Sequence, residues 1–214
     1  LLRVRPDRRC YFEESAPVAD RRERCRHWAA RVALADRGPG AAAADACGRE
    51  GLELPPFPPE TLEALSEFIP HTGSINNPVD ITYSKSQKAF FMDIPQALLN
   101  SSVVDMLLMY YLVPDRMVME SLLQFGASEP ASEAEKQTLL DNYVGGMVQM
   151  LKQHRKPVAG FTFRNLTEKF PQALMAHGIP VFSSPESAVR ALNALVNYCR
   201  LKEKILLQEK DGGR

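Results

Sequence analysis

The sequence has no net charge, no paired-cysteine motif and no apolar stretch of membrane-spanning length. Its 214 residues carry 26 basic and 26 acidic side chains, so no overall charge attracts nucleic acid or an anionic membrane. No run approaches the roughly 18 apolar residues of a transmembrane helix. The first residues lack the apolar core of a signal peptide, and the sequence does not begin with Met. We expect a cytoplasmic protein without nucleic-acid or membrane partners, and a fragment of a longer product.

Metal-ligating and catalytic patterns are also missing. The four cysteines are far apart, no two form a C-x-x-C pair, and no two histidines have metal-ligand spacing, so we predict no metal site. Cys47 and Cys199 lie on predicted apolar helix faces, which is typical of buried thiols in a reducing compartment. No Ser/His/Asp set can be located, and we predict no catalytic residue in this chain.

Lysine is absent before Lys85, whereas residues 1–30 contain eight arginines. These residues show no sustained apolar period, and acidic side chains dilute their positive charge. One hypothesis is a basic arm that binds phosphates or RNA; the other is an irregular boundary segment. We favour the boundary segment because aromatic residues are sparse there.

From residue 31 onward, short buried apolar runs alternate with helical patterns. The runs predict strands at 32–35, 52–54, 103–113, 157–163 and 179–182. Helices are predicted at 41–50, from 59 to about 69, at 85–100 with a kink at Pro95, at 117–125, 133–154 and 166–177, and from Pro185 after a Ser183 or Ser184 cap. This alternation predicts an α/β fold: a flavodoxin-like, doubly wound parallel sheet of about five strands with helices on both faces. We expect this domain to span 31–203 and to be followed by a linker or cut end at 204–214.

Two turns are expected to meet at the ligand-binding edge of that sheet. The turn Gly38-Pro39-Gly40 follows the first strand and opens an alanine-rich helix, and Asn76-Asn77-Pro78-Val79-Asp80-Ile81 is a turn into a short extended piece. In doubly wound sheets, ligands bind at the carboxyl ends of the strands. Taken alone, either turn could be an ordinary strand connection or an Asx-Pro turn.

The order of these motifs resembles a known family. GPGAAAADACGREGLELPPFPPETLEAL, then NNPVDI, and near the end HGIPVF and SPESAVRAL, are similar to the succinyl-CoA-ligase-like flavodoxin domain of NDP-forming acyl-CoA synthetases. That family includes the ADP-forming acetate–CoA ligases and related bacterial protein acyltransferases. The resemblance covers about residues 31–203.

The resemblance implies a role in a larger acid–thiol ligase. Such enzymes reversibly convert a carboxylate, CoA and a nucleoside triphosphate into acyl-CoA, a nucleoside diphosphate and phosphate. A phosphohistidine on another domain carries the phosphoryl group, and helix N-termini cradle it. The resemblance implies that the full enzyme uses CoA, ATP/ADP and Mg, contains partner CoA-binding and ATP-grasp domains, and forms an oligomer. This fragment alone is expected not to catalyse the reaction. The implied phosphate-binding residues are Gly38, Pro39, Gly40 and Ala41, with Asn77, Pro78 and Asp80 as the associated turn.

Two departures from the family pattern keep other hypotheses open. The family's Asn-Gly-Gly before GPG is replaced by Ala35-Asp36-Arg37, where Asp36 would repel a phosphate and Arg37 could offset it. The second departure is that we do not find in this sequence the domain whose HTGA-like loop carries the family's phosphorylated histidine. His71 begins an HTGS that imitates this loop, but it precedes NNPVD, where the family is variable, so we do not assign it that role. One alternative is a non-catalytic interaction or regulatory module, as a degenerate remnant of the family; the other is a flavin-binding protein. We disfavour the last because the chain lacks a hydroxyl-rich phosphate loop after its first strand.

Overall fold

The computed structural model describes residues 30–36, 38–82, 84–86, 88–111, 123, 130 and 132–211. The described residues fall into two compact units, one of residues 30–193 and one from Ala194 onward. The first unit holds the sheet and every residue discussed as a site below. The arginine-rich segment before Ala30 and the predicted helix at 117–125, apart from Leu123, lie outside the described residues.

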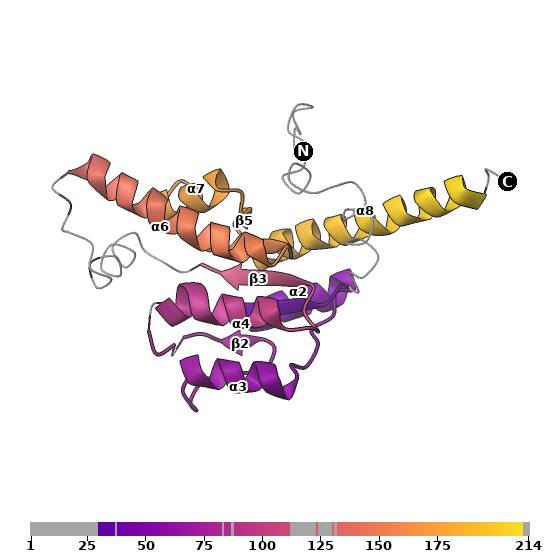
Figure 1. Ribbon diagram of the computed structural model, residues 1–214, viewed down its shortest axis with the longest axis horizontal. Helices are drawn as coiled ribbons and strands as arrows, with labels where there is room; N and C mark the ends of the chain where they lie inside the picture. The colour runs from indigo at the N-terminus through magenta and orange to yellow at the C-terminus, as the bar shows by residue number, and fades with distance from the viewer. Residues whose placement is uncertain are drawn as a thin grey trace. The chain divides into compact units, whose positions relative to one another are not determined.

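A five-stranded, all-parallel sheet runs through the first unit (Figure 1). The order is β2-β1-β3-β4-β5, which is the flavodoxin-like order, so the predicted fold class is confirmed. All five residues of β3 are buried, as its predicted central position requires. The strands are β1 (Val32–Asp36), β2 (Val79–Asp80), β3 (Met106–Tyr110), β4 (Val158–Phe161) and β5 (Val181–Phe182).

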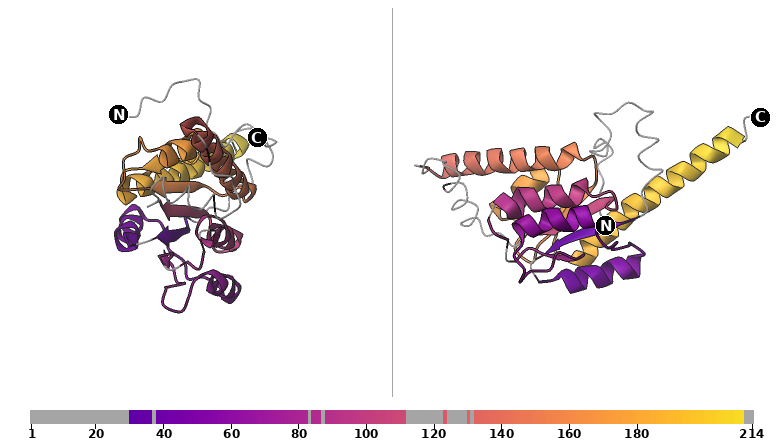
Figure 2. Two further views of the ribbon diagram at one scale, coloured as in Figure 1. Left: turned by 90° about the vertical axis from the view of Figure 1, so that its left-hand side faces the viewer. Right: turned by 60° about the horizontal axis from the view of Figure 1, so that its bottom comes forward.

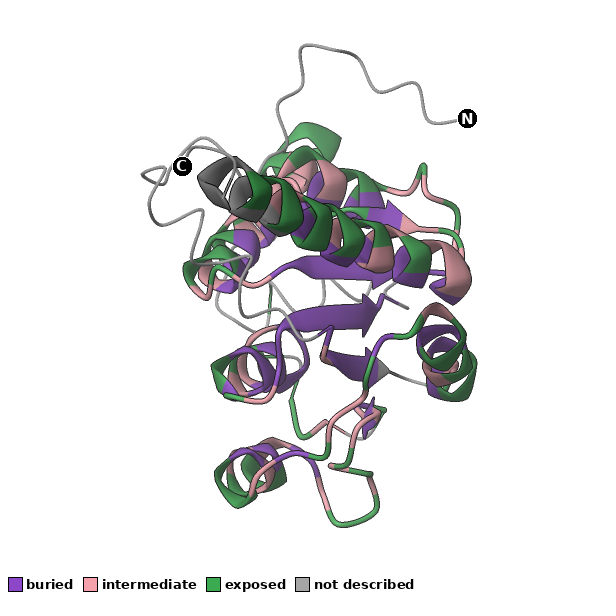
Figure 3. Cartoon of the chain, turned by 90° about the vertical axis from the view of Figure 1, so that its right-hand side faces the viewer, coloured by how far each residue is buried: buried purple, intermediate pink, exposed green. Residues whose placement is uncertain are grey.

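Helices cover both faces of the sheet (Figure 2). α3 packs on α4, α4 on α6 and α6 on α7, while α2 packs on β1. Their inner sides are buried and their outer sides exposed (Figure 3). The helices are α2 (Gly40–Glu50), α3 (Pro59–Phe68), the π-helical turn η1 (Ala89–Asp93), α4 (Ile94–Asn100), α6 (Glu133–Gln153), α7 (Lys169–Ala176) and α8 (Pro185–Asp211).

Local sequence signals explain several helix ends. Gly51 ends α2 with φ +73°, a left-handed conformation that glycine adopts without strain. Ser184 caps α8 by accepting a hydrogen bond from the Ser187 amide at 3.2 Å. The predicted helix at 85–100 is present as the π-helical turn η1 followed directly by α4, and Pro95 is the second residue of α4. The proline therefore lies where the hydrogen-bond pattern changes from π to α, and π-turns and prolines are both common sites of helix kinks.

The predicted strand at 52–54 is wrong, because this segment makes only one parallel bridge, between Arg31 and Glu53. The second strand is instead β2, at Val79–Asp80, inside the segment that was expected to be a turn into a short extended piece. The bridge cannot extend, because the next hydrogen-bonding groups of β1 are taken by the Asn77 side chain and by β2.

No helix among the described residues is long and apolar enough to cross a membrane.

Candidate functional site

The start of α2 follows directly on a glycine turn. Gly38, with φ +133°, turns the chain out of β1, and a hydrogen bond from the Ala43 amide to the Pro39 carbonyl at 3.0 Å opens the helix. The amides of Gly40, Ala41 and Ala42 make no backbone hydrogen bond to another described residue; Arg37, one turn before Ala41, lies outside the described residues. Among the described residues no side chain caps this helix, and its first turn contains no acidic residue. The helix start is therefore open to an anion.

The turn before β2 is fastened to β1 by a side chain. Asn77 Oδ1 accepts a hydrogen bond from the Leu34 amide at 3.0 Å, and its Nδ2 donates to the carbonyl oxygens of Val32 at 2.8 Å and Pro55 at 3.2 Å. These contacts occupy the Asn77 carboxamide on the β1 side of the turn. Asn77 does not line the cavity described below.

Asp80 and Thr82 shape the end of the same turn. The Asp80 amide donates to the Ser74 carbonyl at 2.8 Å, and Asp80 Oδ1 accepts from the Thr82 amide at 2.9 Å. The Asp80 carboxylate therefore closes an Asx turn within its own segment.

The α2 start and this turn line one cavity of about 230 Å³ that is open to solvent. It lies where β1 and β2 end side by side, since Asp36 is paired with Asp80 in the parallel register. The two turns that the sequence predicted to meet at the carboxyl edge are thus neighbours. The residues that line the cavity are Gly38, Gly40, Ala41, Pro78, Val79, Asp80 and Thr82.

Sequence reasoning missed Thr82, which is exposed and adds a hydroxyl group to the cavity wall. The only sequence signal was its place two residues after Asp80, in reach of an Asx turn. Pro39, which was predicted to belong to the phosphate site, caps the helix as a backbone element and does not line the cavity.

Other residues singled out from the sequence lie elsewhere. Arg37 and the side chain of Asp36 are outside the described residues, so their predicted effect on a phosphate stays a prediction. His71 is exposed in the loop after α3 and does not line the cavity.

The cavity is small, and one of the residues that line it, Asp80, is acidic. Within the part of the chain that the structure describes, no three His, Cys, Asp or Glu side chains gather to hold a metal. A volume of about 230 Å³ is below the roughly 300–1,000 Å³ of sites that enclose drug-sized ligands.

A second polar cluster lies at the opposite, amino edge of the sheet. Asp105 accepts three hydrogen bonds from Arg31, from its amide, Nε and Nη2, at 3.1, 3.0 and 2.8 Å. The side-chain hydrogen bonds that Arg31 donates to Asp105 raise the pKa of Arg31. Lys156 donates to the carbonyl oxygens of Leu99 and Ser101, and burial lowers its pKa. The charged groups of Arg31, Asp105 and Lys156 therefore all have hydrogen-bond partners, and these bonds join segments at the amino ends of the strands.

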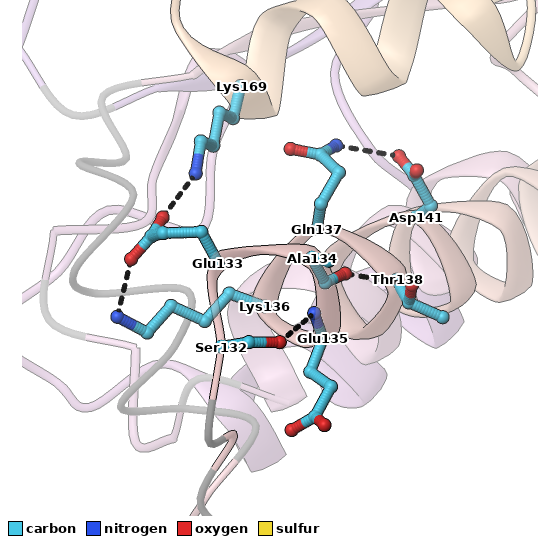
Figure 4. A network of polar contacts seen from close by, with 9 residues as sticks. All are labelled: Ser132, Glu133, Ala134, Glu135, Lys136, Gln137, Thr138, Asp141 and Lys169. Atoms are coloured by element: carbon cyan, nitrogen blue, oxygen red, sulfur yellow. Dashed lines mark hydrogen bonds and ion pairs between the residues drawn. The ribbon is translucent and has the colours of Figure 1, made fainter.

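A third cluster joins the starts of α6 and α7 on the surface (Figure 4). Ser132 accepts from the Glu135 amide at 3.2 Å, while Glu133 binds Lys136 at 2.7 Å and Lys169 at 2.9 Å. The hydrogen bonds from the two lysines lower the pKa of Glu133 to about 2. This cluster links the starts of two helices.

Comparison with known proteins adds a family and a fold. The model of the Ligase-CoA domain family matches residues 32–205. The ADP-forming acetate–CoA ligase I of Archaeoglobus fulgidus is 28% identical over 172 residues, which make up 80% of this chain and 21% of that protein. The chain thus spans about a fifth of the length of this relative.

Solved structures show the same fold. A crystal structure of a protein from Pyrococcus horikoshii OT3 matches 78% of this chain and 35% of its own, with 27% identity and a TM-score of 0.59. The dinucleotide-forming acetyl-coenzyme A synthetase 1 of Candidatus Korarchaeum cryptofilum, in complex with phosphate and ADP, matches 92% of this chain and 40% of its own. Its 19% identity and TM-score of 0.57 support the fold alone.

Proposed function

The chain belongs to the Ligase-CoA domain family, and from this premise we propose that it forms one wall of a phosphoryl-transfer site in a larger ADP-forming acyl-CoA synthetase. The complete enzyme would make acyl-CoA, ADP and phosphate from a carboxylate, CoA and ATP. A phosphohistidine, the CoA-binding residues and the nucleotide-binding residues would come from partner domains. This chain, with a domain of about residues 31–203, would supply the α2 start.

The cavity at the start of α2 is the observation that carries this proposal. A phosphoryl group there would face the backbone at Gly40 and Ala41 and the positive end of an 11-residue helix. One helix end contributes about 0.3–1 kcal/mol at an exposed site and up to about 2 kcal/mol in a partly buried one. Millimolar affinity corresponds to about 4 kcal/mol, so this wall alone should bind free phosphate only weakly. Tight binding would need the second wall from a partner domain.

Phosphate titration with a matched pair of variants tests the proposal. Ala41 is exposed and lines the cavity, so Ala41→Asp places a negative charge there, whereas Ala41→Asn adds a neutral side chain of the same size. A unit charge about 5 Å from a phosphate dianion costs about 1.7 kcal/mol in water, which weakens binding by more than ten-fold. The same charge favours the helix start, so unfolding would not explain the loss.

The measurement is the amide chemical shift of Gly40 and Ala41 as inorganic phosphate is added to the 214-residue chain. We expect saturable shifts in the tens-of-millimolar range in the unmodified chain and in Ala41→Asn, and a midpoint at more than ten-fold higher phosphate in Ala41→Asp. Shifts that do not saturate, or that are equal in both variants, would refute a phosphate site here. An interaction or regulatory module would then be the better function.

Turnover gives a second test. The isolated chain, supplied with a carboxylate, ATP and CoA, should form no acyl-CoA. In the proposal, the phosphorylated histidine, the CoA-binding residues and the ATP-binding residues all lie on partner domains. Acyl-CoA formation by this chain alone would contradict that division of labour.

A further inference from the structure

We propose that Asn77 is a positioning residue: its carboxamide replaces a strand peptide on the edge of β1 and so holds the wall of the cavity against the start of α2. The consequence for phosphate binding rests on the proposed function; the positioning itself does not.

The register of the sheet shows what the Asn77 side chain replaces. β2 is parallel to β1 with Val79 opposite Ala35, so two residues earlier Asn77 stands opposite Ala33. In a parallel ladder, the backbone of a residue opposite Ala33 would form two hydrogen bonds to β1. Its amide would donate to the carbonyl of the residue before Ala33, and its carbonyl would accept from the amide of the residue after Ala33. Those groups are the Val32 carbonyl and the Leu34 amide, and the Asn77 side chain binds both.

Three separate segments therefore share the outer edge of β1. The Glu53 backbone pairs with the Ala30 carbonyl and the Val32 amide, each at 2.9 Å or less. The Asn77 carboxamide takes the next two groups, and β2 pairs from Ala35 onward. The edge is paired along its whole length although β2 has only two residues.

Asparagine suits this place because it offers a donor and an acceptor side by side. The Leu34 amide can only donate and the carbonyls of Val32 and Pro55 can only accept, so the partners fix which way the carboxamide points. An aspartate would keep the acceptor but turn a second charged oxygen toward two carbonyl groups. An alanine would leave the Leu34 amide and the Val32 carbonyl without these partners.

The anchored residue is followed at once by the cavity wall. Pro78, Val79 and Asp80 all line the cavity, and Asp80 in turn orders Thr82 through its carboxylate. Releasing Asn77 from β1 should loosen this wall before it disturbs the rest of the sheet.

Hydrogen exchange on the full chain tests the positioning without any ligand. The Asp80 amide is bound to Ser74 and the Thr82 amide to Asp80, so both should be protected while the wall is in place. We expect Asn77→Ala to speed exchange at both amides at least ten-fold more than it speeds exchange at core amides such as that of Leu107. If Asn77→Ala does not fold, Asn77→Asp gives the same comparison, because it keeps the acceptor for Leu34.

The matched control is Asp105→Asn. Asp105 also accepts a hydrogen bond from a backbone amide next to β1, that of Arg31, which directly precedes the strand. This contact lies at the amino ends of the strands, away from the cavity. The Asp105→Asn variant should change exchange throughout the sheet without a selective effect at Asp80 and Thr82. Equal changes in the two variants at these amides would overturn the proposal.

Two further readouts separate positioning from general destabilisation. Asn77→Asp should regain protection at the Asp80 amide, which is held by the Ser74 backbone carbonyl, as the pH falls below the ordinary aspartate pKa of about 4, because a protonated carboxyl group can again donate to the Val32 carbonyl. Asn77→Ala should also weaken binding of inorganic phosphate about ten-fold, whereas Asp105→Asn should not. If the unmodified chain binds no phosphate, the proposed function fails, and the exchange experiment still decides the role of Asn77. Absence of recovery at low pH would contradict the strand-peptide role.

Discussion

Adding one methyl group at Gly160, inside β4, should destabilise the protein by about 3 kcal/mol. An alanine Cβ at this position would lie 2.5 Å from Cδ2 of Tyr111 and closer still to Cε2. The tyrosine ring cannot easily yield, because it is only 1% exposed and packs edge-on against Phe170 with ring centres 5.8 Å apart. Its hydroxyl group also donates to Sδ of Met109 at 3.4 Å.

The magnitude follows from what must move. Overpacking a core usually costs about 1–3 kcal/mol, and we expect the upper end because two ring atoms collide with the new methyl group. Shifting the ring would also weaken an aromatic contact of about 0.5–1.5 kcal/mol. A loss of about 3 kcal/mol lowers the folded-to-unfolded ratio about 150-fold. For a chain of this size it lowers Tm by about 6–12 °C.

Urea unfolding of Gly160→Ala measures this loss, and Gly146→Ala is the matched control. Gly146 lies in α6 with nothing within 4 Å of an added Cβ, so its replacement should stabilise the protein by about 0.5–1 kcal/mol. Combining Gly160→Ala with Tyr111→Leu should cost less than the sum of the single changes, because the smaller side chain vacates the space. A Gly160→Ala protein as stable as the unmodified one would refute the steric reasoning.

Three other changes test separate parts of the structure. Gly38→Ala should cost about 1 kcal/mol or more in urea unfolding, because φ at this residue is +133°; no loss would mean that the turn relaxes. Arg31→Lys should cost about 1–2 kcal/mol, since a lysine cannot bridge both oxygens of the buried Asp105 carboxylate; an unchanged urea midpoint would contradict this. Glu133 should titrate near pH 2 by NMR, and Lys169→Met should raise that pKa toward 4.5. Because its folded pKa is lowered, the stability that Glu133 contributes is complete above pH 4.5 and is lost as the pH falls toward 2; titration of Glu133 at an ordinary pKa would refute the lysine contacts.

The sequence was enough to predict the fold class, because buried apolar runs alternate with amphipathic helices along the chain. β3 and β4 were found within longer predicted runs, since a fully buried strand has no alternation that marks its ends. β2 was missed because two residues carry no period at all. The segment at 52–54 looked more like a strand than β2 does. It forms only one bridge, at Glu53, because β2 pairs with the later residues of β1.

At the candidate site, local turn chemistry was readable and non-local pairing was not. The turn Gly38-Pro39-Gly40 before an alanine run predicted the open start of α2, because glycine and proline act through their own backbones. The role of Asn77 could not be read in the same way. Its partners lie 43 and 45 residues away in the chain, and a side chain that takes the place of a peptide leaves no periodic trace.

The NPVD motif is therefore best divided by what each residue touches. Asn77 faces β1 and completes its edge, whereas Pro78 and Asp80 face the cavity together with the glycine turn of α2. A motif that only contacted an anion could tolerate any small polar residue at its first position, but the pairing with Leu34 and Val32 requires a donor and an acceptor on one short side chain. The choice of asparagine at position 77 is thus explained by its hydrogen bonds to β1, and the other residues of the motif line the cavity. For the same reason, changes at Asn77 should alter the shape of the cavity, while changes at Asp80 should alter its charge.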